Sequence, residues 1–423
     1  MQLGPVWGKD HRKLFYAFAT FFQISMGIWA VYAENMKKAK KKFETIRGNI
    51  QSHGREVKMR IVVADPIFLP EEYSARLSAL GDLNVYDSVP SSSGEFGERV
   101  KDAEVVIVGR YGFNADAFHS APNLKMISLW QTGYDSVDLA AADEHGVIVS
   151  NVPVYAFDSV AEFVFALALN LIRKVHLADM NLRKGNFDWR NLIGNELMSK
   201  TLGVLGTGDI GKRVIQIAHG FNMSVLSTTA HPSPEKAKTL GVKFVDLDTL
   251  LHESDIVTLH LPLTPETKHM IGASELAKMK PTSILINTAR GKIIDETALV
   301  EALRSKKIAG AGLDVFEREP LPLDSPLLEL KNVVLTPHIA FLSEKSKDEC
   351  TYVTVENVEM FAKGKPQNVV NPVCQLHNYG WAIMSRRSLS AVNATMQFIG
   401  GASDYGNKTL AYRYHRMEVP RRG

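Results

Sequence analysis

The chain has 423 residues, 45% of them hydrophobic and 22% charged, which is the composition of an ordinary folded protein long enough for two domains. Its positive charge lies at the ends. Residues 1–58 carry 11 basic and 4 acidic side chains and residues 374–423 carry 7 and 2, which leaves 31 basic and 40 acidic in residues 59–373. Because residues 59–373 are acidic, the basic pI of the whole chain does not indicate nucleic-acid binding. No nucleic-acid partner is expected. The two cysteines, Cys350 and Cys374, are too few for a disulfide framework and lack metal-ligand spacing, so we expect a reducing compartment and no metal site.

An uncharged run occupies residues 14–33 and precedes a lysine-rich cluster at 37–42. About 20 helical residues span a bilayer, and the lysines would keep the rest of the chain, with its catalytic domain, in the cytoplasm. One interpretation of the run is therefore a membrane anchor. The other is an extension without a role in the activity, because polar residues interrupt the run and Met59 opens a clean strand that would suit a native start.

From Met59 onward, short apolar runs alternate with helical stretches, a pattern typical of parallel βαβ units. The predicted strands are 59–65, 83–86, 103–109, 124–129 and 147–150, and the predicted helices between them include 71–80 and 97–101. One long helix is expected over 160–184, apolar over most of its surface at first. Such a helix is buried between domains or against a second subunit.

A second alternating block begins at Thr201 and holds about seven short apolar runs before one amphipathic helix over 343–363. This pattern predicts an α/β protein with two Rossmann-like, doubly wound parallel-sheet domains, the second inserted into the first, and ligands between them. The predicted boundaries are an extension over 1–58, a substrate (catalytic) domain over 59–157 and 340–373, an NAD(P)-binding domain over 158–339, and a poorly ordered tail over 374–423.

The sequence GVLGTGDIG at 203–211 follows a strand and opens a helix. Its glycines permit a tight turn, close approach of a pyrophosphate to backbone N–H groups, and packing of helix on strand, while the helix N-terminus favours an anion. Asp209 adds a negative charge to this loop and should point away from the phosphates. The candidate cofactor-binding residues here are Gly206, Thr207, Gly208, Asp209, Ile210 and Gly211.

The acidic residue that would bind the adenine ribose is absent, because Thr229 stands at the expected place. Ser227, Thr228, Thr229 and His231 could tolerate a 2′-phosphate, yet no arginine is present to hold one. The cofactor is therefore NAD or NADP. Further cofactor-binding candidates follow later strand-like runs: Leu261, Pro262, Thr288 and Asp314. Asp314 is placed either to hydrogen-bond a nicotinamide carboxamide or to cap a loop.

Three residues far apart in the sequence supply the chemistry: Arg290, Glu319 and His338. A guanidinium can hold a substrate carboxylate and a neighbouring carbonyl oxygen in one geometry. A histidine can give a proton to a carbonyl, or take one from an alcohol, near neutral pH. Glu319 can hold one ring nitrogen of His338 and favour its charged form. Glu317 is a competitor that spacing alone does not exclude.

The segment QTGYDSVD offers backbone N–H groups at Thr132 and Gly133, in a turn that could bind the same carboxylate as Arg290 or could be a simple βα turn. Thr132, Gly133 and Arg290 are thus the candidate substrate-binding residues.

Taken in order and spacing, TLGVLGTGDIG, INTARG, GLDVFEREP and LTPHIA resemble the D-isomer-specific 2-hydroxyacid dehydrogenase family over about residues 59–373. The resemblance implies that Arg290 binds substrate, that Glu319 pairs with the histidine and that His338 is the proton donor. It also implies a homodimer formed through the helix near 160–184. QTGYDSVDL and NVPVYAFDSVAEFVFAL are most similar to the glycerate dehydrogenase and hydroxypyruvate or glyoxylate reductase branch.

The expected function is therefore that of an NAD(P)-dependent oxidoreductase that interconverts a small 2-oxo acid and its D-2-hydroxy acid. Two alternatives stay open on the motifs: a dinucleotide-sensing corepressor of the same fold, and phosphoglycerate dehydrogenase, although residues 374–423 contain no recognisable regulatory domain. A formate dehydrogenase is disfavoured, because that branch resembles this family but places glutamine where Glu319 stands.

Overall fold

A computed structural model describes residues 59–371 of the chain. The uncharged run at 14–33 and the tail over 374–423 lie outside these residues, as do Cys374 and the last two residues of the predicted substrate domain. Within the described range, no helix has the length and apolar character needed to cross a membrane.

The first sheet has five parallel strands in the order β2-β1-β3-β4-β5. The strands are β1 (Met59–Val63), β2 (Gly81–Val85), β3 (Val105–Val108), β4 (Met126–Leu129) and β5 (Ile148–Ser150). Between them lie α2 (Glu71–Ser78), α3 (Ser93–Val100), α4 (Ala115–Ser120) and α5 (Leu139–His145). Every residue of β3, β4 and β5 is buried, as continuous apolar runs in a parallel sheet predict. Ser92, Asn114 and Asp138 cap three of the helices with their side chains, so local sequence marks where these helices begin.

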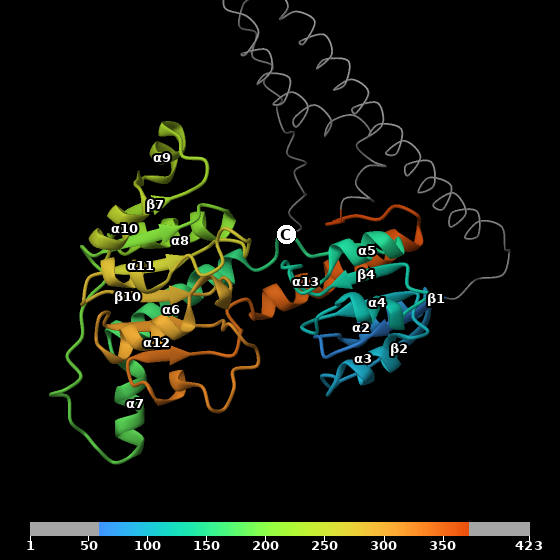
Figure 1. Cartoon of the computed structure of the whole chain (residues 1–423), viewed down its shortest axis with the longest axis horizontal. Helices are drawn as coiled ribbons and strands as arrows, with labels where there is room; N and C mark the ends of the chain where they lie inside the picture. Colours follow the sequence, from blue (N-terminus) through green and yellow to red (C-terminus); the bar gives the residue numbers. More distant parts are fainter. Residues whose placement is uncertain (1–58, 372–423) are drawn as a thin grey trace, which may run out of the picture. The chain divides into compact units, whose positions relative to one another are not determined.

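The second sheet has seven parallel strands in the order β12-β11-β10-β9-β6-β7-β8. They are β6 (Thr201–Leu205), β7 (Ser224–Thr228), β8 (Lys243–Phe244), β9 (Ile256–Leu259), β10 (Ile284–Asn287), β11 (Gly310–Leu313) and β12 (Val333–Leu335). Its helices include α8 (Asp209–Gly220), α9 (Pro234–Leu240), α10 (Leu247–Glu253), α11 (Ala273–Lys278) and α12 (Glu296–Arg304). Figure 1 shows the two groups of strands, each with its own helices. The two parallel-sheet units confirm the predicted fold class.

The seven apolar runs of the second block are the seven strands, with one difference in extent. In KFVDLDTLL only Lys243 and Phe244 are β-strand, because the Asp246 side chain accepts a hydrogen bond from the Thr249 N–H and starts α10. The strand order reverses beside β6, which lies between β7 and β9. At such a reversal, connections leave the sheet in opposite directions and open a crevice at the carboxyl ends of the strands.

The prediction of a single long helix over 160–184 is wrong. The structure has two helices there, α6 (Phe157–Ile172) and α7 (Val175–Arg183). Lys174 between them adopts a left-handed backbone conformation with φ of 55°. The Asn170 side chain accepts a hydrogen bond from the His176 N–H at 2.8 Å and so serves the start of α7, while the Ile172 carbonyl accepts from the Asn195 N–H. Seven residues of α6 are buried and none of α7. The helix therefore ends where its apolar face ends.

The final helix, α13 (Glu344–Ala362), returns to the first sheet, as predicted. It packs against α2 and β4. The indole N–H of Trp130 donates to the hydroxyl of Thr351 at 2.9 Å, and the Ser128 hydroxyl donates to the carbonyl of Thr354. The chain thus leaves the first sheet before α6 and comes back to it after β12.

Candidate active site

Three glycines form the turn between β6 and α8, and the protein itself requires two of them. Gly206 has φ of +97°, and a Cβ there would lie 2.3 Å from the carbonyl oxygen of His260. A Cβ at Gly211 would lie 2.1 Å from the carbonyl oxygen of Gly206. By contrast, a Cβ at Gly208 would meet nothing within 4 Å. Gly208 is therefore not needed for packing, and the space beside it is open to a ligand.

The N-terminus of α8 fits the pyrophosphate of a dinucleotide. Gly208 is its N-cap, so no side chain satisfies the first N–H groups of the helix. The Asp209 carboxylate is 66% exposed and binds Lys212, three residues further along α8, at 3.0 Å. Unsatisfied N–H groups and the positive end of the helix dipole together favour an anion at this position.

A cavity of about 560 Å³ continues this site beyond β7 and is lined by Thr228, Thr229 and Lys243, among others. The hydroxyls of Thr207 and Thr229 are 3.1 Å apart. Ser227, one of the residues expected to tolerate a 2′-phosphate, is fully buried and donates its hydroxyl to the carbonyl of Val204, so that expectation is wrong for Ser227. His231 is not among the lining residues. Lys243 is the basic residue of the lining, and sequence reasoning missed it because it lies 14 residues after Thr229 on another strand.

The segment after β9 packs against the glycine turn. The carbonyl of His260 limits the space at Gly206, and the Leu261 side chain would approach a Cβ there to 3.0 Å. Burial lowers the pKa of His260 to about 3, and its Nε2 pairs with the Thr258 hydroxyl at 3.0 Å. A neutral imidazole in this place adds no charge beside the turn. Pro262 follows directly and accepts a hydrogen bond from Thr267 through its carbonyl.

The turn after β10 holds Thr288 and Arg290. Asn287, almost fully buried, donates from its amide to the carbonyl of Arg290 at 2.9 Å and accepts from the Ala289 N–H at 3.0 Å. The Thr288 hydroxyl is buried and has no partner within residues 59–371. A buried hydroxyl without a partner is costly, so an unpaired one beside a nucleotide-binding turn fits a bound ligand group.

Arg290 contacts the first sheet's loop after β4. Its Nε binds the Asp135 carboxylate at 2.9 Å, and its Nη1 donates to the carbonyl of Ala289. A Cβ built on Gly133 would lie only 1.6 Å from the Nη2 of Arg290. The backbone N–H groups of Thr132 and Gly133 donate to no acceptor in the described part of the chain, while the Thr132 hydroxyl donates to the carbonyl of Val152. The structure thus brings all three substrate-binding candidates together, and it adds Asp135, whose partner lies 155 residues away.

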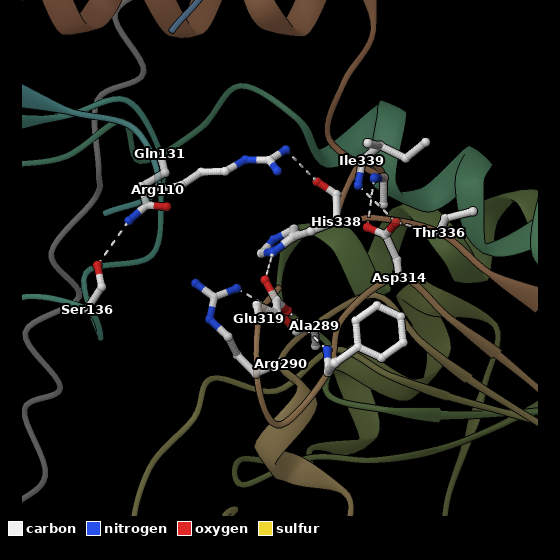
Figure 2. A network of polar contacts seen from close by, with 12 residues as sticks. Arg110, Gln131, Ser136, Ala289, Arg290, Asp314, Glu319, Thr336, His338 and Ile339 are labelled. Carbon is white, nitrogen blue, oxygen red and sulfur yellow. Dashed lines mark hydrogen bonds and ion pairs between the residues drawn. The ribbon is translucent and has the colours of Figure 1, made fainter. Parts of the chain in front are cut away.

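His338 and Glu319, the candidate proton-transfer residues, are in direct contact, with Nδ1 of the ring 2.7 Å from a carboxylate oxygen (Figure 2). Because an ionised carboxylate only accepts, Nδ1 carries the proton and Nε2 is left for a substrate. Glu319 also accepts from the Phe316 N–H at 3.0 Å. Burial alone would raise the pKa of Glu319, but the hydrogen bond and charge of His338, with help from Phe316 and Arg290, leave this pKa below its usual value. The competitor Glu317 contacts His269 instead.

Asp314 fixes the loop that carries His338. Its fully buried carboxylate accepts from the Thr336 hydroxyl at 2.6 Å and from the N–H groups of Ile339 and Ala340 at 2.9 and 2.8 Å. Burial raises its pKa, and these hydrogen bonds and the charge of His338 only partly offset that effect. His338 itself has φ of 55°, a strained value for a non-glycine residue that the surrounding hydrogen bonds must impose. Figure 2 shows Asp314, Thr336 and Ile339 on one side of His338 and Arg110 on the other.

Arg110 is a site residue that the sequence did not reveal. Its Nη2 donates to the carbonyl of His338 at 3.3 Å. Asp65, fully buried two residues after β1, accepts from the N–H groups of Gly109, Arg110 and Tyr111 at 2.7 to 2.9 Å and so fixes the turn after β3. The signal that could have found it was the unexplained aspartate at the end of MRIVVAD.

Comparison with known proteins agrees with this geometry. Residues 165–340 match the family model described as "D-isomer specific 2-hydroxyacid dehydrogenase, NAD binding domain". The chain is 40% identical to glyoxylate reductase of Korarchaeum cryptofilum, over 74% of this chain and 96% of that protein. It is 38% identical to hydroxypyruvate reductase of Blautia hydrogenotrophica, over 74% and 100%. D-3-phosphoglycerate dehydrogenase of Methanocaldococcus jannaschii is 39% identical over 74% of this chain, but only 59% of that protein is covered.

Two of the solved structures similar to this chain contain a nicotinamide cofactor. D-lactate dehydrogenase of Aquifex aeolicus, complexed with NAD and lactic acid, is 34% identical to this chain. The match covers 72% of this chain and 96% of that protein, with a TM-score of 0.64. An acyclic imino acid reductase in complex with NADPH and D-Arg is 33% identical, covers 74% and 100%, and has a TM-score of 0.67. Both forms of the nicotinamide cofactor thus occur among proteins similar to this one.

Proposed function

Because this chain belongs to the D-isomer-specific 2-hydroxyacid dehydrogenase family and is an NAD(P)-dependent oxidoreductase, we propose that it reduces a small 2-oxo acid of the glyoxylate or hydroxypyruvate type to the D-2-hydroxy acid, reversibly. The observation that carries the proposal is the pairing of His338 with Glu319 at 2.7 Å in a site that also holds Arg290. The extent of the match to the glyoxylate reductase, 96% of its length, supports this substrate type over phosphoglycerate.

The carboxylate of the substrate would lie against Arg290. The guanidinium is held through Nε and Nη1, which leaves Nη2 over Gly133 to meet the ligand. The N–H groups of Thr132 and Gly133, which have no acceptor in the described range, supply donors to the same carboxylate. One charged guanidinium nitrogen with two neutral N–H donors gives the acid one orientation, which sets which face of its carbonyl is exposed.

His338 would protonate the carbonyl oxygen from Nε2 in the reductive direction and take the proton back in the oxidative one. Glu319 holds Nδ1–H, so it fixes the tautomer and stabilises the positive charge that the ring carries before it gives up the proton. Arg110 and Asp314 both bind the peptide that follows His338, Arg110 at the His338 carbonyl and Asp314 at the Ile339 N–H. The proton donor is therefore oriented before substrate arrives.

The dinucleotide would be held by the glycine turn 206–211, by Thr229 at the ribose, and by Leu261, Pro262, Thr288 and Asp314 near the nicotinamide. When bound, it supplies or accepts the hydride. The open space at Gly208 and the unpaired Thr288 hydroxyl support this assignment. Asp314 already accepts three hydrogen bonds from the His338 loop, so a contact with a carboxamide stays a prediction.

The division of labour between domains follows the same lines. We assign cofactor binding to residues 158–339, which contain the glycine turn, and substrate binding to 59–157 with 340–373, which contain Thr132 and Gly133. We place the activity in the cytoplasm, where the cell keeps its nicotinamide cofactors. Whether residues 14–33 anchor the enzyme to a membrane is tested by asking if the full chain needs detergent to stay in solution.

A second copy of the chain would cover α7 and the segment that follows it. Large apolar side chains are exposed along this stretch, with Phe187 91% and Trp189 71% exposed. The others are Val175, Met180, Leu182, Ile193 and Met198. Clustered exposed apolar side chains of this size mark an interaction surface. We therefore propose a homodimer, built on α7 and residues 184–198 rather than on the buried α6.

The proposal is tested by the oxidation of NADH and NADPH by the purified full chain against a panel of 2-oxo acids that includes glyoxylate, hydroxypyruvate, pyruvate and 3-phosphohydroxypyruvate. Turnover that is lost in Arg290→Ala and His338→Ala supports a dehydrogenase. Binding of dinucleotide without turnover of any acid would instead favour a dinucleotide-sensing corepressor and contradict the enzymatic proposal.

A further inference from the structure

Three segments around the second sheet meet at the carboxylate of Glu317. One oxygen binds the Nε2 of His269 at 2.8 Å and also accepts from the N–H of Glu296 at 3.2 Å. In return, the N–H of Glu317 donates to the carboxylate of Glu296 at 3.2 Å. The turn after β11, the start of α12 and the turn before α11 are therefore joined through one side chain. Burial and the charge of Glu317 raise the pKa of Glu296, so two acidic groups share this place and a histidine faces them.

The same side chains hold the turn that carries Arg290. A Cβ at Gly291 would lie 1.9 Å from the carbonyl carbon of Phe316 and 2.5 Å from the Glu317 nitrogen, so the two turns are in direct backbone contact. His269 joins them from the other side, because its N–H donates to the carbonyl of Lys292 at 2.8 Å. It does so with φ of 53°, a backbone value that costs energy outside glycine. One histidine thus touches the Arg290 turn through its backbone and the Glu319 turn through its ring.

Glu317 is two residues from Glu319, and Phe316 between β11 and this turn donates its N–H to Glu319. A shift of Glu317 therefore moves the carboxylate that orients His338. Neither His269 nor Glu317 contacts His338 itself within the described residues. Any effect of the two on catalysis must pass through the turns that they hold.

We propose that His269 and Glu317 are positioning residues for the reaction, and that the hydrogen bond between them locks the Arg290 turn to the Glu319 turn so that the acid-binding and proton-transferring groups keep one spacing. The inference rests on the proposed dehydrogenase function. It assigns a role to Glu317, the glutamate that sequence spacing leaves as a rival of Glu319.

The test compares His269→Ala and Glu317→Ala with His252→Ala, a matched control whose ring, among residues 59–371, hydrogen-bonds to the Asp248 carbonyl in its own helix and to nothing else. We expect both lock variants to lose about ten- to a hundredfold in kcat/KM for the 2-oxo acid, with a lower kcat and a higher KM, because misplacement of this kind costs such factors. The control should stay within twofold of the natural chain. Glu317→Gln keeps an oxygen for the Glu296 N–H and should recover part of the loss.

A second readout needs no turnover. Nitrogen NMR of the His338 ring at alkaline pH, assigned by its loss in His338→Gln, should show Nδ1–H in the natural chain and a larger share of Nε2–H in His269→Ala and Glu317→Ala. Variants that fold with a lowered melting temperature, yet keep both kcat/KM and the His338 tautomer, would show a merely structural pair and overturn the proposal. If the natural chain reduces no 2-oxo acid, the enzymatic proposal fails while the tautomer comparison still decides the lock.

Discussion

The guanidinium of Arg290 lies directly over the α-carbon of Gly133, where a Cβ would approach Nη2 to 1.6 Å. The two residues are 157 positions apart in the sequence, and the Asp135 carboxylate holds the arginine in this place at 2.9 Å. The absent side chain at Gly133 is thus what allows the loop after β4 and the arginine after β10 to lie against each other.

Gly133→Ala should therefore raise KM for the 2-oxo acid by at least about tenfold, since the new methyl group displaces Arg290 and one lost charged contact costs about 1.5 to 3 kcal/mol. KM for the cofactor should change little. Gly220→Ala is the matched control, because a Cβ there meets nothing within 4 Å. An unchanged KM in Gly133→Ala would mean that Arg290 does not bind the acid.

Removing the proton donor should affect kcat far more than binding. His338→Gln should lower kcat by about 10²- to 10⁴-fold, the usual contribution of general acid catalysis, with a small change in KM. Glu319→Gln should cost less, because the amide can still accept from Nδ1–H but brings no charge. Stopped-flow single-turnover rates separate this loss from product release. A kcat loss in Glu319→Gln that exceeds the loss in His338→Gln would contradict the assigned roles.

The lowered pKa of Glu319 predicts a pH dependence of stability. A carboxylate with a lower pKa in the folded than in the unfolded state contributes stability above its unfolded pKa, about 4.3, and loses that contribution as pH falls through the folded value. The difference in unfolding free energy between the natural chain and Glu319→Gln should be constant above about pH 5 and shrink below about pH 4. Urea unfolding across pH 3 to 7 measures it. A difference that grows as pH falls would reverse the assigned sign.

Cofactor preference should respond to the cavity beyond β7. Thr229→Asp places a carboxylate where a 2′-phosphate would lie, so the ratio of kcat/KM for NADH over NADPH should rise at least about tenfold through like-charge repulsion. Lys243→Ala should move the ratio the same way by a smaller factor, since it removes the cation of the lining. Lys238→Ala, which changes an exposed lysine on α9, is the control. A ratio that neither variant changes would place the ribose elsewhere.

The apolar stretch after α7 predicts the oligomeric state. Phe187→Asp with Trp189→Asp should convert a particle of two copies into one copy, because buried charges without partners are not tolerated in an interface core. Light scattering after size exclusion gives the mass. Val89→Asp changes another exposed apolar residue in the first domain and should leave the mass unchanged. A natural chain that runs as a monomer at micromolar concentration would refute the dimer.

Much of this organisation could be predicted from sequence, and the exceptions share a physical cause. The strands were readable because a parallel sheet buries both faces and leaves continuous apolar runs. The glycine turn, Arg290, Glu319 and His338 were readable because each follows such a run at the end where ligands gather. The break at Lys174 was not, since it depends on Asn170 and Asn195 capping the two helix ends, and a lysine gives no local sign of a left-handed backbone.

Contacts between distant segments account for the rest. Arg110, Asp135 and His269 each contact a partner far away in the sequence, and Lys243 lines the cavity from another strand, so no local pattern marks these residues. Ser227 shows the converse case, because it lies in the expected strand but turns its hydroxyl inward to Val204. Strand periodicity gives a residue's face only where the two faces differ, and in a sheet buried on both sides they do not.

The loop that carries His338 is also the second passage of the chain between the two sheets, since β12 ends at Leu335 and α13 starts at Glu344. Asp314, which follows β11, accepts hydrogen bonds from two N–H groups of this loop. Ser159 belongs to α6, in the first passage, and its hydroxyl donates to the carbonyl of Ala340. A hinge between the domains would therefore run through the very peptide that holds the imidazole. The same movement of this loop would then close the enzyme on its ligands and bring the His338 imidazole to the substrate carbonyl.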